Sequence, residues 1–200
     1  DNYKGGTDRV TNVLDFAGRI LETKTTHSES DIVWKDVVGS VVEGNKLRRT
    51  VAGATWGPSG AVSTSQLPAG QNGWVEFYAS ESNLHRMLGF SDVNTDASYA
   101  TIDFALHLRN DATVAVYESS TLRGTFGSYA PGDLFRIERT GTVIKYYRNG
   151  SLLYTSTVAS SSLLMVDCAI YDFNATLANV RASFGGSSKT IARRFEYDAG

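Results

Sequence analysis

The stretch GDLFRIERTGTVIKYYRNGSLLY, residues 132–154, decides the fold class of this chain. Apolar and polar residues alternate through 133–139 and again through 142–148, which is the period-two pattern of a strand with one buried face. Asn149 and Gly150 then precede a third run over 151–157. A two-residue type I′ turn needs a positive φ at both central residues, which Asn and Gly tolerate, so the stretch predicts strands joined by tight hairpin turns.

The same pattern continues on both sides of this stretch. Short apolar runs, many with period two, are bounded by Gly, Asn, Asp or Ser, and a second turn, Arg109-Asn-Asp-Ala112, separates two of them. Besides the three runs above, we expect strands at 45–51, 61–66, 73–80, 86–91, 101–109, 112–118, 121–127, 163–171 and 175–184. The chain is therefore predicted to be all-β.

Composition bounds the class of protein and its partners. The chain has 200 residues, of which 42% are hydrophobic and 11% aromatic, as expected of one folded domain with short flanking pieces. Its 19 basic and 21 acidic residues give a net charge of -2, which argues against a nucleic-acid or anionic-membrane partner. No apolar run is long enough to span a membrane. The single cysteine, Cys168, lies in an apolar run and is expected to be a buried free thiol.

One segment, residues 7–21, does not fit the strand pattern cleanly. Val10, Val13, Leu14 and Ala17 follow helical spacing, whereas Gly18 and the β-branched residues count against a helix. Periodicity leaves helix and strand equally open there. Because the chain begins at Asp1, we expect it to be a piece of a longer protein.

Two short motifs at the ends of the chain resemble the repeat of Rhs, or YD-repeat, proteins. The run Leu14-Asp-Phe-Ala-Gly-Arg19 is similar to the Y-D-x-x-G-R signature, with Leu in place of Tyr, and Arg193-Arg-Phe-Glu-Tyr-Asp-Ala-Gly200 is similar to the opening of another repeat. In that family each repeat is a β-hairpin of a large shell, so the resemblance implies strands at about 8–27 and 189–200. It divides the chain into a repeat-like segment 1–27, an inserted domain 28–187 and the start of the next repeat, 188–200. It also implies a secreted or surface-displayed bacterial protein.

The middle domain resembles concanavalin A-like lectins and laminin G-like jelly rolls. In those folds a strand of the form G-D-x-φ-x-φ precedes a strand that ends in Asn-Gly, as residues 132–150 do here. Three earlier runs, at 73–77, 88–90 and 102–106, fit the same order of strands. The resemblance implies a concanavalin A-like jelly-roll β-sandwich with short flanking YD-repeat strands.

Motifs for catalysis are missing from the sequence. It contains no G-x-S-x-G nucleophile turn, no H-E-x-x-H zinc motif, no P-loop and no G-x-G-x-x-G. The paired carboxylates of laminarinase-like enzymes and the motifs of alginate lyases, both found on this class of jelly roll, do not occur either. We therefore expect the chain not to be an enzyme.

A binding face is the remaining candidate for function. Splitting the strands by parity places Val75 and Phe77 inside and Trp74, Glu76 and Tyr78 outside. The same split places Asp103, His107 and Tyr117 outside on two later strands. If these strands share one sheet, as the lectin-like order implies, its solvent face carries all six residues. Aromatic planes stack on sugar rings, and carboxylate and imidazole groups bind hydroxyls, but exposed aromatic residues also stabilise sheets that bind nothing.

Two loop features add further candidates. Trp56 lies in a Gly/Pro-rich loop, where it either binds ligand or plugs the end of the sandwich. Asp92, Asn94 and Asp96 alternate as calcium ligands do, although the segment departs from the EF-hand pattern and a solvated turn is the simpler interpretation. Calcium is therefore the one candidate cofactor.

The sequence supports three hypotheses. The first is a non-catalytic, lectin-like carbohydrate-binding module of a larger Rhs-type protein, with a polysaccharide or other glycan and the rest of the parent chain as partners. The second is a structural or protein-interaction insert, whose outward face would be covered by residues 28–42 or by the parent scaffold. The third is a glycan-cleaving enzyme, for which Glu76 and Asp103 are the only carboxylate pair to nominate.

Overall fold

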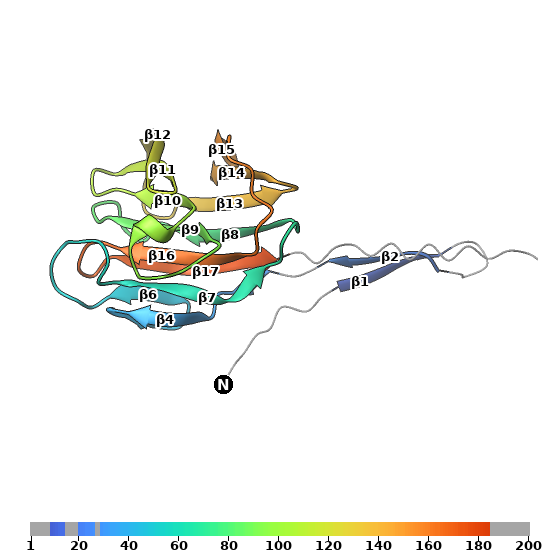
Figure 1. Cartoon of the computed structure of the whole chain (residues 1–200), viewed down its shortest axis with the longest axis horizontal. Helices are drawn as coiled ribbons and strands as arrows, with labels where there is room; N and C mark the ends of the chain where they lie inside the picture. The colour runs from blue at the N-terminus through green and yellow to red at the C-terminus, as the bar shows by residue number, and fades with distance from the viewer. Residues whose placement is uncertain (1–8, 15–19, 27–28, 185–200) are drawn as a thin grey trace, which may run out of the picture.

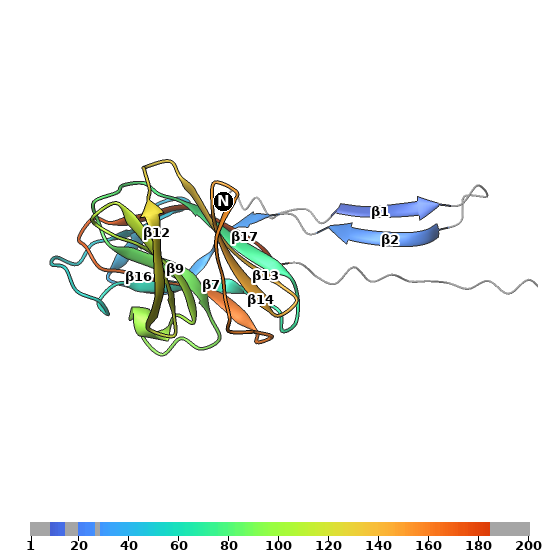
Figure 2. The same ribbon diagram turned by 90° about the horizontal axis from the view of Figure 1, so that it is seen from above.

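The chain folds as a sandwich of two antiparallel β-sheets. The computed structural model describes residues 9–14, 20–26 and 29–184, and the side chains of 29–184. In Figure 1 most strands of both sheets lie roughly along one common axis, with neighbouring strands antiparallel. Figure 2 shows the two layers apart. One sheet has seven strands, in the spatial order β12 (Thr121–Ser128), β11 (Thr113–Glu118), β10 (Phe104–Leu108), β9 (Arg86–Ser91), β16 (Leu164–Ile170), β7 (Gly60–Leu67) and β4 (Trp34–Val38).

The second sheet has eight strands. Its spatial order is β15 (Ser151–Thr155), β14 (Val143–Arg148), β13 (Leu134–Thr140), β8 (Gly73–Tyr78), β17 (Thr176–Phe184), β6 (Lys46–Arg49) and β5 (Ser40–Val42), while β3 (Ser30–Asp31) also pairs with β17. Between β9 and β10 lies one short 3-10 helix, η1 (Tyr99–Thr101). Within the described residues, no helix is long and apolar enough to cross a membrane.

The hairpin stretch forms as its sequence predicts. Strands β13, β14 and β15 pair in succession, and the turn residues Asn149 and Gly150 have φ angles of 50° and 78°. The Asn149 side chain also ties the turn to the start of β13, because its Oδ1 accepts a 2.8 Å hydrogen bond from the Leu134 amide. The other predicted strands are confirmed to within three residues at each end.

Three short strands escaped prediction. In β4 only Trp34 is buried, and β3 and β5 have no buried residue, so none of them carries the alternation that a half-buried strand shows. Two of them, β4 and β5, lie at the edges of the two sheets. Segment 30–42 therefore extends the sheets sideways and does not supply the cover that the structural-insert hypothesis needs. Cover by the parent scaffold stays a prediction of that hypothesis.

Residues 9–14 and 20–26 form a separate pair of strands. Strands β1 (Arg9–Leu14) and β2 (Ile20–Thr26) pair antiparallel with a bulge between Val13 and Leu14, so the strand alternative is confirmed over the helix. A pair of strands does not by itself identify a YD repeat, which stays a prediction. The expected strand at 189–200 lies outside the described residues.

The core lies between the two sheets. Phe77 and Phe135 of the eight-stranded sheet stack with ring centroids 5.7 Å apart and face Leu88, Phe90 and Leu106 of the other sheet. Each such side chain contributes about 2 kcal/mol when it is fully buried. Cys168 is buried in this core and unpaired, as predicted. Because core residues alternate along every strand, the residues between them project from the two outer faces of the sandwich.

Candidate functional site

The six residues that we expected on one face lie on two opposite faces. Strand β8, with Trp74, Glu76 and Tyr78, belongs to the eight-stranded sheet, whereas β10 and β11, with His107 and Tyr117, belong to the seven-stranded sheet. The expectation that these strands share a sheet is therefore wrong. The residues are separated because β8 pairs with β13 and β17 in one sheet, and the chain crosses to the other sheet before β9.

The outer face of the eight-stranded sheet carries an ion-paired ladder across three strands. Glu76 stands in register with Arg136 of β13 on one side and Arg181 of β17 on the other. Its Oε1 accepts a 2.6 Å hydrogen bond from Arg136 Nε, and its Oε2 accepts 3.0 and 3.2 Å bonds from Arg181 Nη2 and Nε. The Glu76 side chain is only 4% exposed, so both of its oxygens are occupied and it fixes the two arginines.

Arg136 in turn links the ladder to an aromatic ring and to a second carboxylate. Its guanidinium carbon lies 4.4 Å from the centroid of the Trp74 ring, a cation–π contact. Its Nη1 lies 3.4 Å from Oε2 of Glu138, which also accepts a 3.0 Å bond from the Thr140 hydroxyl through Oε1. These contacts hold one arginine between a ring and two acids.

Two adjoining hollows open on this face, and Glu138 lines both. The first encloses about 420 Å³ and is lined by Glu76, Leu134, Arg136, Glu138, Tyr147 and Gly150. The second encloses about 320 Å³ and is lined by Asn72, Gly73, Trp74, Glu138, Arg139, Thr140 and Ser183. We call the two together the ladder groove. Each hollow combines one aromatic side chain with several polar ones.

The groove offers hydrogen-bond donors as well as acceptors. Partial burial and the nearby charge of Glu138 raise the pKa of Tyr147, although Arg136 offsets part of this effect, so the phenol keeps its proton at neutral pH and can donate. Arg136 donates, and Glu138 and Asn72 accept. Sequence reasoning found Trp74 and Glu76 but missed Arg136, Glu138, Tyr147 and Arg181; Tyr78, at the end of β8, lines neither hollow. The period-two alternation in residues 132–154 could have identified three of the missed residues, because Arg136, Glu138 and Tyr147 stand at its outward positions.

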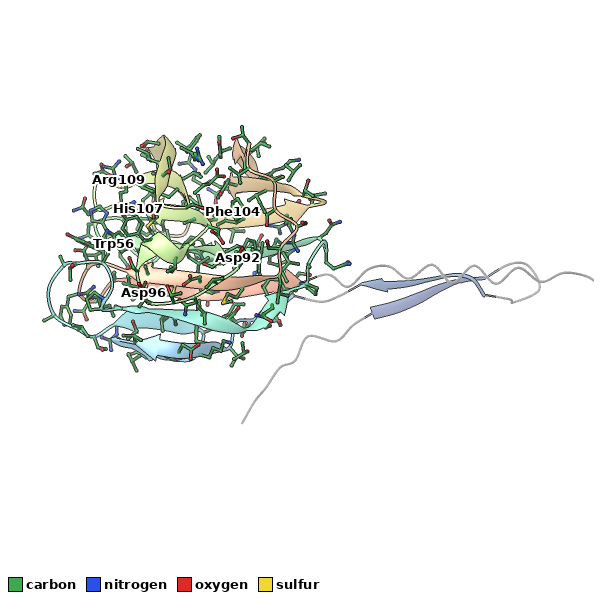
Figure 3. The ribbon with its side chains drawn as sticks, in the orientation of Figure 1. Trp56, Asp92, Asp96, Phe104, His107 and Arg109 are labelled. Carbon is green, nitrogen blue, oxygen red and sulfur yellow. The ribbon has the colours of Figure 1, made fainter. Side chains whose placement is uncertain are left out.

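The opposite face, on the seven-stranded sheet, is covered by a cluster of aromatic residues. The Trp56 ring lies 5.1, 5.4 and 5.0 Å from the rings of Tyr99, His107 and Tyr171. Figure 3 shows Trp56 next to His107 beside η1. Tyr117 packs against Tyr99 and His107 at 6.2 and 5.5 Å. Trp56 therefore packs over this face of the sheet against the neighbouring rings. Ligand binding by Trp56 stays a prediction.

A histidine pair and a buried arginine hold this cluster. His85 Nδ1 and His107 Nε2 lie 3.0 Å apart, and burial, with a smaller contribution from His85, lowers the pKa of His107 to about 3. The pair is therefore neutral at physiological pH. The fully buried Arg49 donates through Nη1 to the carbonyls of Thr55 and Ile170, both at 2.7 Å, which fastens the loop that carries Trp56 to β16.

The acidic residues near η1 do not gather around one point. The Asp92 amide donates a 2.9 Å hydrogen bond to Asp103 Oδ2, while Asn94 and Asp96 line a separate hollow of about 240 Å³ with Asp36. Figure 3 places Asp92 and Asp96 apart. Over residues 29–184, no three His, Cys, Asp or Glu side chains lie close enough together to hold a metal ion. Calcium binding by Asp92, Asn94 and Asp96 stays a prediction.

The nominated catalytic pair is also separated. Glu76 lies in the ladder of the eight-stranded sheet, whereas Asp103 bonds to the Asp92 amide at the seven-stranded sheet. A retaining glycosidase needs its two carboxyl groups about 5–5.5 Å apart and both facing the sugar. Glu76 and Asp103 face opposite sides of the sandwich and cannot meet this requirement.

Comparisons with known proteins identify the class of fold. No protein-family model and no curated protein matches the chain. Among solved structures, the carbohydrate recognition domain of Emp46p, in a point-mutant form, superimposes with a TM-score of 0.57 at 11% identity, over 77% of this chain and 89% of that one. A galectin-like protein of unknown function from Bacillus subtilis gives 0.56 at 10% identity, over 92% and 100%. A human SPRY domain gives 0.54 at 12% identity, over 78% and 99%. At these identities the likeness shows the fold alone, and the fold of this chain is the concanavalin A-like, galectin-type jelly roll.

Proposed function

We propose that this chain is a non-catalytic glycan-binding module whose site is the ladder groove. The observation that carries the proposal is the pairing, in each of two adjoining hollows, of one aromatic ring with directed polar groups: Tyr147 with Arg136 in the first, Trp74 with Asn72 and Thr140 in the second. Pyranose rings present apolar C–H faces and a rim of hydroxyls, and a site for them needs both kinds of surface. At about 420 Å³, the first hollow lies within the usual range of ligand pockets.

The alternatives fit this surface less well. A structural insert would have its outward face covered. Segment 30–42 lies at the sheet edges and leaves the groove open, so this alternative would need the parent scaffold as the cover. The carboxylate pair nominated for an enzyme does not fit, because both oxygens of Glu76 are held by guanidinium groups and Asp103 lies at the other sheet. A carbohydrate recognition domain with the same fold, that of Emp46p, supports sugar binding by analogy.

The proposal also includes the longer protein that would carry this module. The YD-like ends of the chain support a place within a longer Rhs-type protein that is secreted or displayed at a cell surface, and the module would bring that protein to a glycan. The affinity of a single module is expected to be modest, because a shallow polar groove gains little net free energy after its groups are desolvated.

A glycan array probed with the full chain tests this proposal, alongside three single variants. We expect Trp74→Ala and Tyr147→Ala each to weaken binding about tenfold, the usual effect of truncating an aromatic anchor. Trp56→Ala, on the opposite face, is the matched control and should leave binding unchanged. Thermal unfolding of each variant verifies that it is folded.

The other outcomes discriminate among the hypotheses. If only Trp56→Ala abolishes binding, the site lies in the aromatic cluster and the ladder groove is not the site. If no variant binds differently from wild type, neither surface holds the sugar. If the wild-type chain binds no glycan across plant, algal and microbial panels, the proposal is wrong and a structural insert is the better account.

A further inference from the structure

The ladder groove is built in two halves that share one wall. Glu138 lines both hollows, with Tyr147 on one side and Trp74 on the other. A single sugar ring can stack on only one of these aromatic side chains at a time. A ligand that uses both must therefore extend past Glu138 and place a different residue of the glycan in each hollow.

The arginines of the groove are not free to clamp an anion. Arginine recognises carboxylate or sulfate best through two parallel N–H groups on one edge of the guanidinium. In Arg136 the edge formed by Nε and Nη2 faces Glu76 Oε1 at 2.6 and 2.5 Å. In Arg181 the same edge faces Glu76 Oε2, and Nη1 bonds to Glu29 at 3.1 Å. Glu76 thus occupies the Nε–Nη2 edge of both arginines, and the Nη1 of each contacts a further acid, Glu138 or Glu29. Arg139, which lines the second hollow, donates to three backbone carbonyls instead.

The net charge around the first hollow does not attract an anionic ligand. The first hollow is lined by two carboxylates, Glu76 and Glu138, and one guanidinium, Arg136. Around the hollow, Arg181 pairs with both Glu76 and Glu29, and Lys145 stands in register with Glu138 on the neighbouring strand, so three acids and three bases bring the local sum to zero. Since the Glu138 side chain is 27% exposed, its charge is the one that an incoming ligand meets.

From these observations we infer that the ladder groove binds an uncharged glycan of at least two sugar units, and that Glu138 is the residue that excludes acidic glycans. This inference rests on the proposed function of the groove. A uronate or sulfate group next to Glu138 would add like-charge repulsion without gaining a free arginine edge. Hydroxyl groups, in contrast, can donate to Glu138 and accept from the remaining N–H groups of Arg136.

The test is a set of binding titrations on the full chain. The neutral probes are the hexasaccharides of cellulose, xylan, mannan and galactan, and the acidic probes are hexagalacturonate, hexaguluronate and a chondroitin sulfate hexasaccharide. We expect binding only among the neutral probes at about 0.05 M NaCl, where charge repulsion is little screened. The disaccharide of the best binder should bind at least about tenfold more tightly than its monosaccharide, because each occupied hollow adds an aromatic contact.

The proposed role of Glu138 in excluding acidic glycans is measured separately. The quantity to measure is the affinity for an acidic probe divided by the affinity for a neutral probe. Glu138→Gln should raise this ratio about fivefold at low salt, and the gain should shrink at about 0.5 M NaCl as charges are screened. Glu43→Gln is the matched control, because Glu43 is an exposed acid held by Arg48 in another part of the chain. It should leave the ratio unchanged.

The outcomes separate this inference from the proposal beneath it. Preference for acidic probes, an unchanged ratio in Glu138→Gln, or equal affinity of mono- and disaccharide overturns the inference while glycan binding stands. Failure of the chain to bind any neutral or acidic glycan overturns the proposed function, and the inference falls with it.

Discussion

The contribution of Asp167 to the stability of this protein should fall as the pH rises. The residue lies on β16, is 1% exposed, and accepts hydrogen bonds at Oδ2 from Ser91 Oγ at 2.5 Å and from Thr101 Oγ1 at 3.4 Å. Burial raises its pKa from 3.8 to about 7; the two hydroxyls lower it in part, and the charge of Asp103 adds to the rise. The folded protein therefore keeps a proton between these two values that the unfolded chain releases.

The sign and size of the effect follow from proton linkage. A carboxyl group with a raised pKa in the folded state contributes stability below its unfolded pKa of 3.8, and that contribution is lost as the pH rises to about 7. The loss amounts to about 1.4 kcal/mol per pH unit, or about 4 kcal/mol in all. Asp167→Asn cannot ionise and keeps an acceptor for Ser91. The stability of this variant relative to wild type should therefore increase steadily from about pH 4 to about pH 7.

The measurement is urea unfolding at four pH values between about 4.5 and about 7.5, followed by tryptophan fluorescence. Comparison with a variant is essential because His107 works in the opposite direction. Its pKa of about 3 makes wild-type stability decline as the pH falls below 6.5, so the two groups nearly cancel in the wild-type profile. A difference between Asp167→Asn and wild type that stays within about 0.5 kcal/mol over the whole range would refute the reasoning.

Three further predictions concern the loops. Arg139→Lys should cost about 2–4 kcal/mol in urea unfolding, because the buried guanidinium bonds to carbonyls of Gln71, Ser162 and Pro68, which one ammonium cannot satisfy together. Gly150→Ala should cost about 1 kcal/mol in thermal unfolding, since its φ of 78° strains any side chain; no loss would mean that the turn adapts. Arg49→Lys should speed proteolysis within 51–56 about tenfold by releasing the loop that bears Trp56, and unchanged cleavage would contradict the role of that arginine.

Most of the fold was predictable because it rests on local signals. The alternation of 133–139 and 142–148 and the turn at Asn149-Gly150 depend on residues within a few positions of one another, and each predicted the right element. The strands that were missed bury almost nothing, and two of them, β4 and β5, lie at sheet edges, so their sequence carries little of that signal. The choice between helix and strand at 7–21 needed a resemblance, because the periodicity of that segment left both open.

The site was harder to predict, because its residues come together only through pairing of distant strands. Parity placed Trp74, Glu76 and His107 correctly on outward positions. It could not tell which sheet each strand joins, since both sheets of a sandwich turn their apolar faces toward the same core and give the same inward–outward pattern. Segment 79–85, between β8 and β9, is long enough either to return within one sheet or to cross to the other.

A specific long-range pairing resolves that ambiguity. Glu76 meets Arg136 and Arg181, 60 and 105 residues away along the chain, because β8 lies between β13 and β17. The sequence alone does not show that this carboxylate lies between two guanidinium groups. That arrangement becomes visible only once the pairing and register of the three strands are known. In a β-sandwich, strand parity therefore identifies the surface residues, whereas the order of strands in each sheet decides which of them form a site.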